Sequence, residues 1–212
     1  MIDLYTWSTP NGRKVSIALE EMGLDYEVHP INITKDEQLA PDFLKISPNN
    51  KIPAIVDRDN GGQTVFESGA ILLYLAERTG AFMPDDAAGR IRVWEWLMWQ
   101  MGGFGPMLGQ AHHFLRFNPG KAPYAGDRFG AETKRLYGVL DKQLGQTGYA
   151  AGDALSIADF AIWPWASRYE WQQIDMNAFP NVKRWYVELA GREGFRKGYN
   201  VPASDQTMPV PD

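Results

Sequence analysis

The chain has 212 residues, of which 44% are hydrophobic and none is cysteine. Without cysteine there can be no disulfide framework, no Cys-X-X-Cys redox pair, no cysteine nucleophile and no thiolate metal site. The formal net charge of −5 argues against binding to nucleic acid or to an anionic membrane, and no apolar run approaches the ~20 residues that span a bilayer. The amino-terminal residues lack the pattern of a secretory signal, so a cytoplasmic location is expected.

Composition changes near residue 80 and divides the chain in two. Seven of the eight tryptophans lie after that point, and residues 1–80 carry 12 acidic and 7 basic side chains, whereas the remainder is neutral. We expect one domain over residues 1–80 and a second over residues 88–200, whose first helix is capped by Asp85 or Asp86. Residues 201–212 contain three prolines and should form an extended tail that is ordered only if it docks.

The first domain alternates strands and helices. Apolar residues at helical spacing, followed by Gly23, predict a helix that ends near Met22, and Ser68 should open another helix. A short helix is expected over residues 41–46, and β-rich runs predict strands over residues 2–7, 26–31, 54–57 and 63–66. The resulting order, βαβαββα, makes this domain an α/β unit.

The second domain is expected to be all-α. Apolar stripes predict helices over residues 90–101, 128–144, 156–171 and 181–190. The Gly- and Pro-containing run at residues 102–106 should break or kink the first of these helices. Ser156 and Asp159 have the spacing of a capping box, so we interpret Asp159 as structural rather than catalytic.

The Ile52-Pro53 pair directly precedes the third expected strand. Proline fits the start of a strand because it cannot donate a ladder hydrogen bond. A trans bond would only end the preceding loop. A cis bond would turn the backbone N–H and C=O of Ile52 outward, toward an extended peptide ligand. We expect the cis form on the basis of the fold, because X-Pro bonds in general are mostly trans.

Glu67-Ser68 lies where the fourth strand meets a helix. Ser68 suits an N-cap position, which is the purely structural interpretation. Alternatively, the N–H groups of the helix start and the Ser68 hydroxyl bind a ligand carboxylate, while Glu67 pairs with an ammonium. An α-amino acid end carries both charges, so Glu67 and Ser68 match it as a set.

Residues 8–12, Ser-Thr-Pro-Asn-Gly, connect the first strand to the first helix. Most such turns only cap the helix. Hydroxyl and N–H donors at a helix N-terminus also favour a thiolate, which is the minor form of a thiol with a pKa of ~8.5 at neutral pH. Thr9 and Asn11 are therefore candidate donors to a ligand sulfur.

A substrate groove is expected in the second domain. The adjacent His112 and His113 point about 100° apart on a helix and cannot easily chelate one ion, so no metal site is expected. With Phe104 and Phe117, they are candidates to line the groove and to set the choice of substrate.

These features resemble the glutathione S-transferase family over essentially the whole chain. Within the family, the chain is similar to the Nu class, the bacterial disulfide-bond oxidoreductases. The stretches that carry this similarity are Thr9-Pro10-Asn11-Gly12, residues 46–55, residues 66–75, and residues 105–110 with His112-His113-Phe114, the last being the most specific.

The resemblance implies a thioredoxin-like first domain, an all-α second domain and a homodimer. It implies that Thr9 and Asn11 are catalytic and face the sulfur of glutathione. It assigns the binding of the tripeptide to Lys51, Ile52, Pro53, Glu67 and Ser68, and that of the neighbouring subunit's tripeptide to Arg128. Glutathione carries two carboxylates, so an acidic domain needs such cations locally, although Arg128 on a solvated helix face is the alternative.

Tyr5 departs from a common family pattern. Many members activate the thiol with a tyrosine at the end of the first strand, whereas Tyr5 should lie within the strand and short of the turn. We therefore expect Tyr5 to belong to the core.

The implied activity is glutathione-dependent disulfide-bond reduction, with glutathione as cosubstrate and two molecules, or one glutathione disulfide, in each site. The same site would serve a transferase that conjugates electrophiles or reduces organic hydroperoxides. An alternative of another class is a non-catalytic, glutathione-binding regulatory protein. A small-molecule thiol or disulfide substrate is the expected partner, with no nucleic acid and no membrane.

Overall fold

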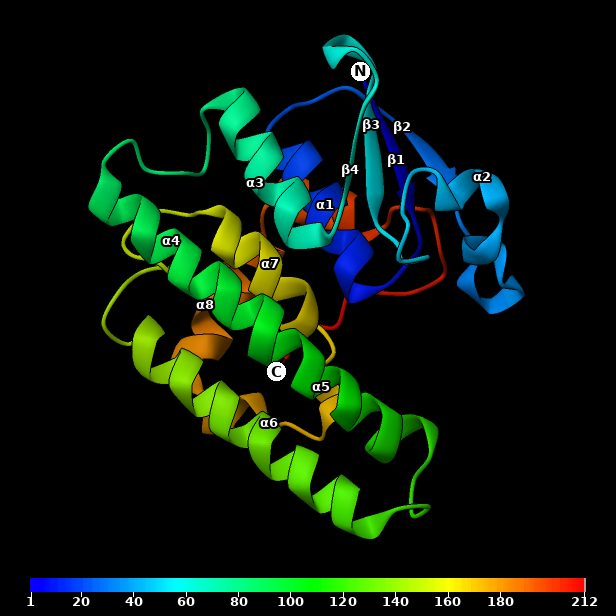
Figure 1. The fold of residues 1–212 in the computed structure, drawn as a ribbon. Coiled ribbons are helices and arrows are strands. Elements are labelled where there is room, and N and C mark those ends of the chain that lie inside the picture. The colour runs from blue at the N-terminus through cyan, green and yellow to red at the C-terminus, as the bar shows by residue number, and fades with distance from the viewer. Residues whose placement is uncertain (212) are drawn as a thin grey trace. The chain divides into compact units, whose positions relative to one another are not determined.

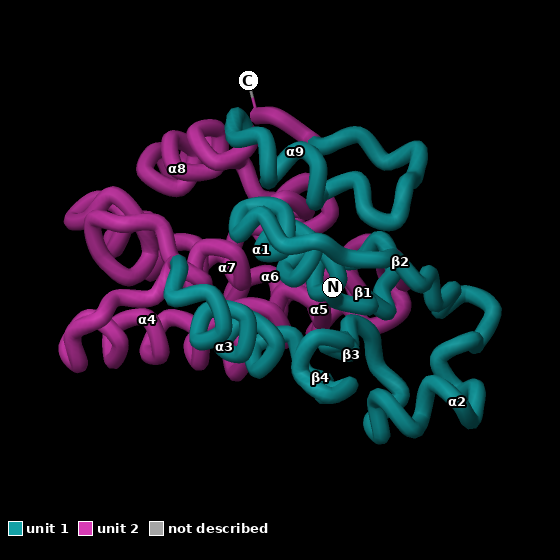
Figure 2. Tube along the Cα trace, turned by 90° about the horizontal axis from the view of Figure 1, so that it is seen from above, with its two compact units in different colours: residues 1–81, 191–208 teal, residues 82–190, 209–212 magenta. Residues whose placement is uncertain are grey.

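The computed structural model describes residues 1–211, which form two compact units (Figures 1 and 2). Unit 1 comprises residues 1–81 and 191–208, and unit 2 comprises residues 82–190 with the residues from Pro209 onward. The sequence assigned residues 191–200 to the helical domain. The structure corrects this boundary, because the last helix packs on the first helix of unit 1.

Unit 1 is built around a four-stranded sheet. Its elements are β1 (Ile2–Thr6), α1 (Pro10–Glu21), β2 (Tyr26–Pro30), α2 (Pro41–Leu44), β3 (Ala54–Asp57), β4 (Gln63–Phe66), α3 (Ser68–Thr79) and α9 (Glu193–Tyr199), with 3-10 turns at Ile33–Lys35, Glu37–Leu39 and Arg58–Asn60. The strand order is β2-β1-β3-β4; β1 is parallel to β2 and antiparallel to β3, and β4 is antiparallel to β3. The predicted α/β class and element order are confirmed (Figure 1).

The core of unit 1 forms between the central strand and α1. Ile2 and Leu4 of β1 are completely buried, as are Val15 and Leu19 of α1. Gly12 lies where α1 begins beside the end of β1, and a Cβ there would come within 2.3 Å of a backbone carbonyl oxygen. Glycine is therefore needed for the close approach of the helix start to the strand.

The carboxyl-terminal helix α9 is fixed to α1 by close packing. A Cβ on Gly198 would come 2.6 Å from backbone atoms of Ile17, so the two helices touch at a glycine. Arg13 is completely buried beside this contact, with its guanidinium 3.6 Å from the centre of the Tyr199 ring. The Arg13 Nε also donates a hydrogen bond to the Tyr199 carbonyl at 2.9 Å.

The extended segment after α9 docks on unit 1. The Ser8 hydroxyl donates to the Pro202 carbonyl at 3.2 Å, and Arg13 Nη2 donates to Gln206 Oε1 at 2.9 Å. The tail that the sequence expected to be ordered only by docking therefore lies against the turn that precedes α1.

The regular elements of unit 2 are helical, as predicted. They are α4 (Ala87–Trp99), α5 (Gly105–Ala111), α6 (Pro123–Leu144), α7 (Ile157–Ala166) and α8 (Pro180–Ala190), with π-helical segments at Gln100–Phe104 and His112–Phe117 and 3-10 turns at Tyr169–Gln172 and Met176–Ala178. α6 begins before the predicted residue 128, and α7 ends before the predicted residue 171. Within residues 1–211, no helix has both the length and the apolar character to cross a membrane.

Residues 102–106 were predicted to break or kink the helix, and the structure shows no break. Helical backbone continues from α4 through the π-helical segment into α5, with Pro106 in the first turn of α5. Proline is tolerated there, and a π turn supplies an extra residue that relieves the backbone. Of the glycines in this run, Gly105 serves packing, because a Cβ there would come 3.3 Å from the Trp165 ring, as would one on Gly109 in α5.

Two predicted caps in unit 2 are confirmed. Asp86 caps α4 by accepting a backbone hydrogen bond from its first turn at 2.8 Å. Asp159 is completely buried at the start of α7, where its Oδ2 accepts from the N–H and the hydroxyl of Ser156 at 3.0 and 3.1 Å. Its Oδ1 accepts from the N–H of Ala150 and from Trp185 Nε1, both at 2.9 Å. These four contacts account for Asp159 as a structural acceptor.

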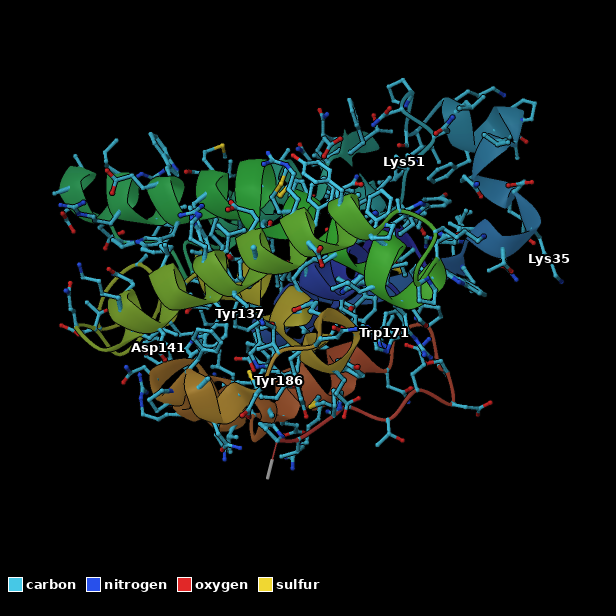
Figure 3. The ribbon with its side chains drawn as sticks, turned by 90° about the horizontal axis from the view of Figure 1, so that it is seen from below. Lys35, Lys51, Tyr137, Asp141, Trp171 and Tyr186 are labelled. Carbon is cyan, nitrogen blue, oxygen red and sulfur yellow. The ribbon has the colours of Figure 1, made fainter. Side chains whose placement is uncertain are left out.

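Two side chains of α6 organise the rest of unit 2 (Figure 3). Asp141 accepts hydrogen bonds from the backbone N–H groups of Asn181 and Val182 at 2.8 and 3.1 Å, which satisfies the start of α8. The hydroxyl of Tyr137 donates to Gln172 Oε1 at 2.7 Å. The Asp141 contact caps α8 with a side chain from α6, so no local sequence pattern predicts it.

Candidate functional site

A cavity of about 190 Å³ in unit 1 brings together most of the residues predicted to contact glutathione, although Thr9 and Arg128 do not line it. Its walls come from the start of α1, the loop before β3, and the junction of β4 with α3. The lining residues are Asn11, Ser47, Lys51, Ile52, Pro53, Phe66, Glu67 and Ser68. Three motifs that are separated along the chain therefore meet at one place.

The loop before β3 forms one wall of the cavity. The Ile52-Pro53 bond is cis, as predicted. Ser47 is completely buried, and its hydroxyl donates to the Lys51 carbonyl at 2.8 Å, which holds the loop in place. Lys51, labelled in Figure 3, lines the cavity and is exposed, so its ammonium is available to an anionic ligand.

The Glu67-Ser68 junction forms the opposite wall. Glu67 has a φ of 69°, which is unusual for a residue with a side chain and costs of order 1–3 kcal/mol. Such strain is typical of functional sites, and here it presents Glu67 to the cavity. The N-cap position of α3 is Glu67, and Ser68 is the first helical residue. The interpretation of Ser68 as the N-cap is thus corrected.

Lys14, which the sequence analysis did not select, lies behind this junction. Its Nζ donates a hydrogen bond to the Ser68 hydroxyl oxygen at 3.2 Å, and the side chain is 1% exposed. Burial lowers the pKa of Lys14 to about 7, against the opposing attraction of the Glu67 carboxylate. A lysine in the middle of a helix gives no local sign that it will be buried.

The turn that contains Thr9 and Asn11 completes the site. Thr9 is the N-cap of α1, and its Oγ1 accepts from the Gly12 N–H at 3.1 Å, so the capping interpretation of this turn holds. Asn11 lines the cavity, whereas Thr9 is half-buried and is not one of the residues that line it. A hydroxyl that accepts one hydrogen bond keeps its own proton for donation, so capping and a role toward sulfur are compatible.

Tyr5 is half-buried in unit 1, so it packs against neighbouring rings but does not belong to the fully buried core that was expected. Its ring stacks on His29 with centroids 4.7 Å apart and lies 6.3 Å from Phe43. Burial raises the pKa of the Tyr5 hydroxyl, which disfavours a phenolate. Tyr5 is not one of the residues that line the cavity.

The four residues predicted to line a substrate groove lie in different environments of unit 2. Phe104 is completely buried between Trp99 and Tyr137, with ring centroids 5.0 and 5.5 Å away. His112 is also buried. The prediction for these two is corrected, because they pack inside unit 2, whereas His113 is exposed and Phe117 is 61% exposed. Arg128 is exposed on α6.

One cluster has the composition of a metal site. Ligand atoms of Asp3, Glu27 and His29 lie within 4.8 Å of one another. Arg58 already supplies a cation there, because its guanidinium donates to Asp3 and to Glu27. The Arg58 guanidinium also lowers the pKa of Asp3. The cluster therefore ties the Arg58 turn to the sheet.

Comparison with known proteins identifies the family of the chain. Family models for glutathione S-transferase match residues 1–77 (N-terminal domain) and residues 104–193 (C-terminal domain). Disulfide-bond oxidoreductase YfcG of Escherichia coli is 50% identical over 196 residues, which are 91% of this chain and 91% of that protein. A glutathione transferase from Burkholderia graminis, with two glutathione molecules bound per subunit, has a TM-score of 0.88 and 44% identity over 95% of this chain and 88% of that one. A glutathione transferase from Pseudomonas putida, with one glutathione disulfide bound per subunit, has a TM-score of 0.89 and 42% identity over 95% and 92% of the two chains. Both family models fall on the units described above, and the chain belongs to the glutathione S-transferase family.

Proposed function

We propose that this protein is a glutathione-dependent disulfide-bond reductase of the Nu class. The observation that carries the proposal is the cavity of unit 1, which combines Asn11, Lys51, Ile52, Glu67 and Ser68 in a chain without cysteine. Glutathione is the cosubstrate. The similar structures that hold two glutathione molecules, or one glutathione disulfide, support two tripeptide positions in each site.

Glutathione matches the charges around the cavity. Its γ-glutamyl end carries a carboxylate and an ammonium, which suit the start of α3 at Ser68 and the Glu67 carboxylate respectively. The backbone of Ile52 before the cis proline offers peptide groups to the middle of the tripeptide. Lys51 is placed to meet a carboxylate.

The proposed chemistry consists of two thiol–disulfide exchanges. Thr9 and Asn11 stabilise the thiolate of one glutathione, and this thiolate attacks a sulfur of the substrate disulfide. The S–S bond of the substrate breaks as a mixed disulfide between glutathione and the substrate forms. The other substrate sulfur leaves as a thiolate and takes up a proton. The thiolate of a second glutathione attacks the glutathione sulfur of the mixed disulfide. Glutathione disulfide forms, and the second substrate thiol is released. Two electrons pass from two glutathione thiols to the substrate.

Other reactions would use the same thiolate. Conjugation to an electrophile and reduction of organic hydroperoxides both begin with its attack, so they are the alternative activities. A regulatory protein that binds glutathione without turnover is the alternative of another class. Asn11 in the cavity favours an enzyme, because a tripeptide that is only bound needs no donor for its sulfur.

We further propose that the protein is a cytoplasmic homodimer. Ile91, Trp94 and Met98 recur at helical spacing on α4 and remain exposed, as expected of a stripe that a second copy covers. Arg128 is then proposed to reach the glutathione of the neighbouring subunit, where it would meet a carboxylate. A chain without cysteine that depends on reduced glutathione suits a reducing compartment.

The decisive assay compares two reactions of the purified protein. We expect glutathione-dependent reduction of a small model disulfide to exceed conjugation of an aromatic halide. Strong conjugation without reduction would refute the proposed reaction, and tight glutathione binding without either reaction would favour the regulatory alternative. Thiol-alkylating reagents, removed before the assay, should leave the activity unchanged because the chain has no cysteine.

The role of Thr9 has a separate test. Thr9→Ala should lower kcat more than it raises the glutathione KM, because it removes a donor to the thiolate. Thr9→Ser, which keeps both the hydroxyl and the helix cap, is the matched control and should retain activity. A loss that lies mainly in KM would make Thr9 a residue that positions the tripeptide.

A further inference from the structure

A buried cation lies one side chain away from the candidate ligand. Lys14 Nζ donates to the hydroxyl oxygen of Ser68, and Ser68 lines the cavity. The lining residues do not include Lys14, which is almost completely buried. Any effect of this lysine on a ligand must therefore act through Ser68 and through its electric field.

Burial of the Lys14 side chain costs folding free energy. Lysine is almost never fully buried unless it is paired, because an ammonium loses its hydration. Methionine has a similar volume and would fill the space without that cost. An ammonium can only donate hydrogen bonds, so the Ser68 oxygen is the acceptor in this pair, and Lys14 controls how the hydroxyl is oriented.

We propose that Lys14 is a positioning residue for the α-carboxylate of the γ-glutamyl end of glutathione. It orients Ser68 and places a positive charge behind the start of α3, which receives the carboxylate. The proposal rests on the proposed function, since it takes glutathione as the ligand of this cavity. It adds a group that does not touch the ligand and that makes recognition of the carboxylate depend on a protonation state.

The charges around Lys14 indicate at which pH its protonation should affect ligand binding. The Glu67 carboxylate attracts the Lys14 ammonium, and burial brings the pKa of Lys14 to about 7. On other elements that pack on α1, several charged groups form ion pairs: Arg78 with Asp57, Lys197 with Glu193, and Asp3 with Arg58. Glu77 and Arg196 are exposed to solvent. A bound carboxylate favours the protonated form, so binding should be tighter below pH 7 than above it.

The experiment measures binding of S-methylglutathione, whose sulfur cannot ionise, to the whole protein between pH 6 and 8. The affinity of the natural protein should fall by up to about tenfold across this interval, the factor that corresponds to one unit of pKa change in Lys14 on binding. Lys14→Met should bind about tenfold more weakly at pH 6 and show no such pH dependence. Its kcat at saturating glutathione should stay within about twofold. Lys35→Met changes an exposed lysine of unit 1 (Figure 3) and should behave as the natural protein.

Two further measurements isolate the mechanism. Ser68→Ala combined with Lys14→Met should cost little more than either change alone, because both act on one contact. Should Lys14→Met fail to fold, the natural protein alone provides a test. Calorimetry in two buffers of different ionisation enthalpy measures the protons taken up when S-methylglutathione binds, and near pH 7.5 we expect proton uptake. Unchanged affinity in Lys14→Met, or binding without proton uptake, would overturn the role of Lys14 alone. A natural protein that does not bind S-methylglutathione would instead overturn the proposed function.

Discussion

Mild acid should destabilise unit 2 through a single histidine. His112 is buried, with its ring stacked on Trp165 at a centroid distance of 5.7 Å. Its Nε2 lies 3.0 Å from the amide nitrogen of Gln172, which can only donate, so His112 is an acceptor there and is neutral. Burial, together with the nearby positive charge of Arg168, lowers the pKa of His112 from 6.5 to about 4.

The sign and size of the effect follow from this pKa. The unfolded chain takes up a proton on His112 near pH 6.5, whereas the folded chain does so only near pH 4. The stabilising contribution is therefore complete above pH 6.5 and is lost as the pH falls toward 4. The loss amounts to about 2 kcal/mol at pH 5 and about 3 kcal/mol at its limit.

Urea unfolding at pH 7.5 and pH 5.0 measures this loss. Between the two pH values, the natural protein should lose about 2 kcal/mol more unfolding free energy than His112→Gln, in which the titrating group is gone. His113→Gln changes the exposed neighbour and should behave as the natural protein. Equal losses in the natural protein and His112→Gln would refute the reasoning, whatever the stability of the variant at pH 7.5.

Three other substitutions test features of the fold and the site. Asp159→Ala should lower the free energy of unfolding in urea by about 3–5 kcal/mol, because it leaves buried N–H donors unpaired. The control Asp127→Ala, on the exposed face of α6, should change this free energy by less than about 0.5 kcal/mol. If Asp159→Ala kept its full stability but lost turnover, Asp159 would be catalytic instead. Glu67→Ala should raise the glutathione KM about tenfold to a hundredfold by leaving the ligand ammonium without its partner, and an unchanged KM would contradict that pairing. Gly12→Ala should lower the free energy of thermal unfolding by about 1–3 kcal/mol, because its Cβ meets the end of β1, and an unchanged Tm would show that the turn adjusts freely.

The features that were predictable from sequence depend on neighbouring residues. The strands around β1, the end of α1 near Gly23 and the caps at Asp86 and Asp159 are each encoded within a few positions. The cis bond before Pro53 and the meeting of three motifs at one cavity required the resemblance to a known family, because no local rule brings residues 11, 52 and 67 together.

The features that were missed depend on contacts between distant residues. Lys14 meets Ser68 across 54 positions, so its burial is decided by how α1 packs on α3. Phe104 was placed in a groove because an aromatic residue between glycines gives no sign of which face is covered, yet Trp99 and Tyr137 enclose it. The π-helical turns before and after α5 were not predicted either, and the contact of Gly105 with the Trp165 ring joins residues 60 positions apart.

The packing of α9 on α1 also bears on how the protein is made. The Ser16 hydroxyl donates to the Gly198 carbonyl at 2.6 Å across 182 positions, and Arg13 is covered by Tyr199. During synthesis, α1 therefore leaves the ribosome long before α9 is made, so the Arg13 side chain is not yet covered by Tyr199. The unit that holds the candidate site can be completed only after translation has passed residue 199. A nascent chain, a fragment that ends near residue 81 and a truncation before α9 therefore all lack part of this unit.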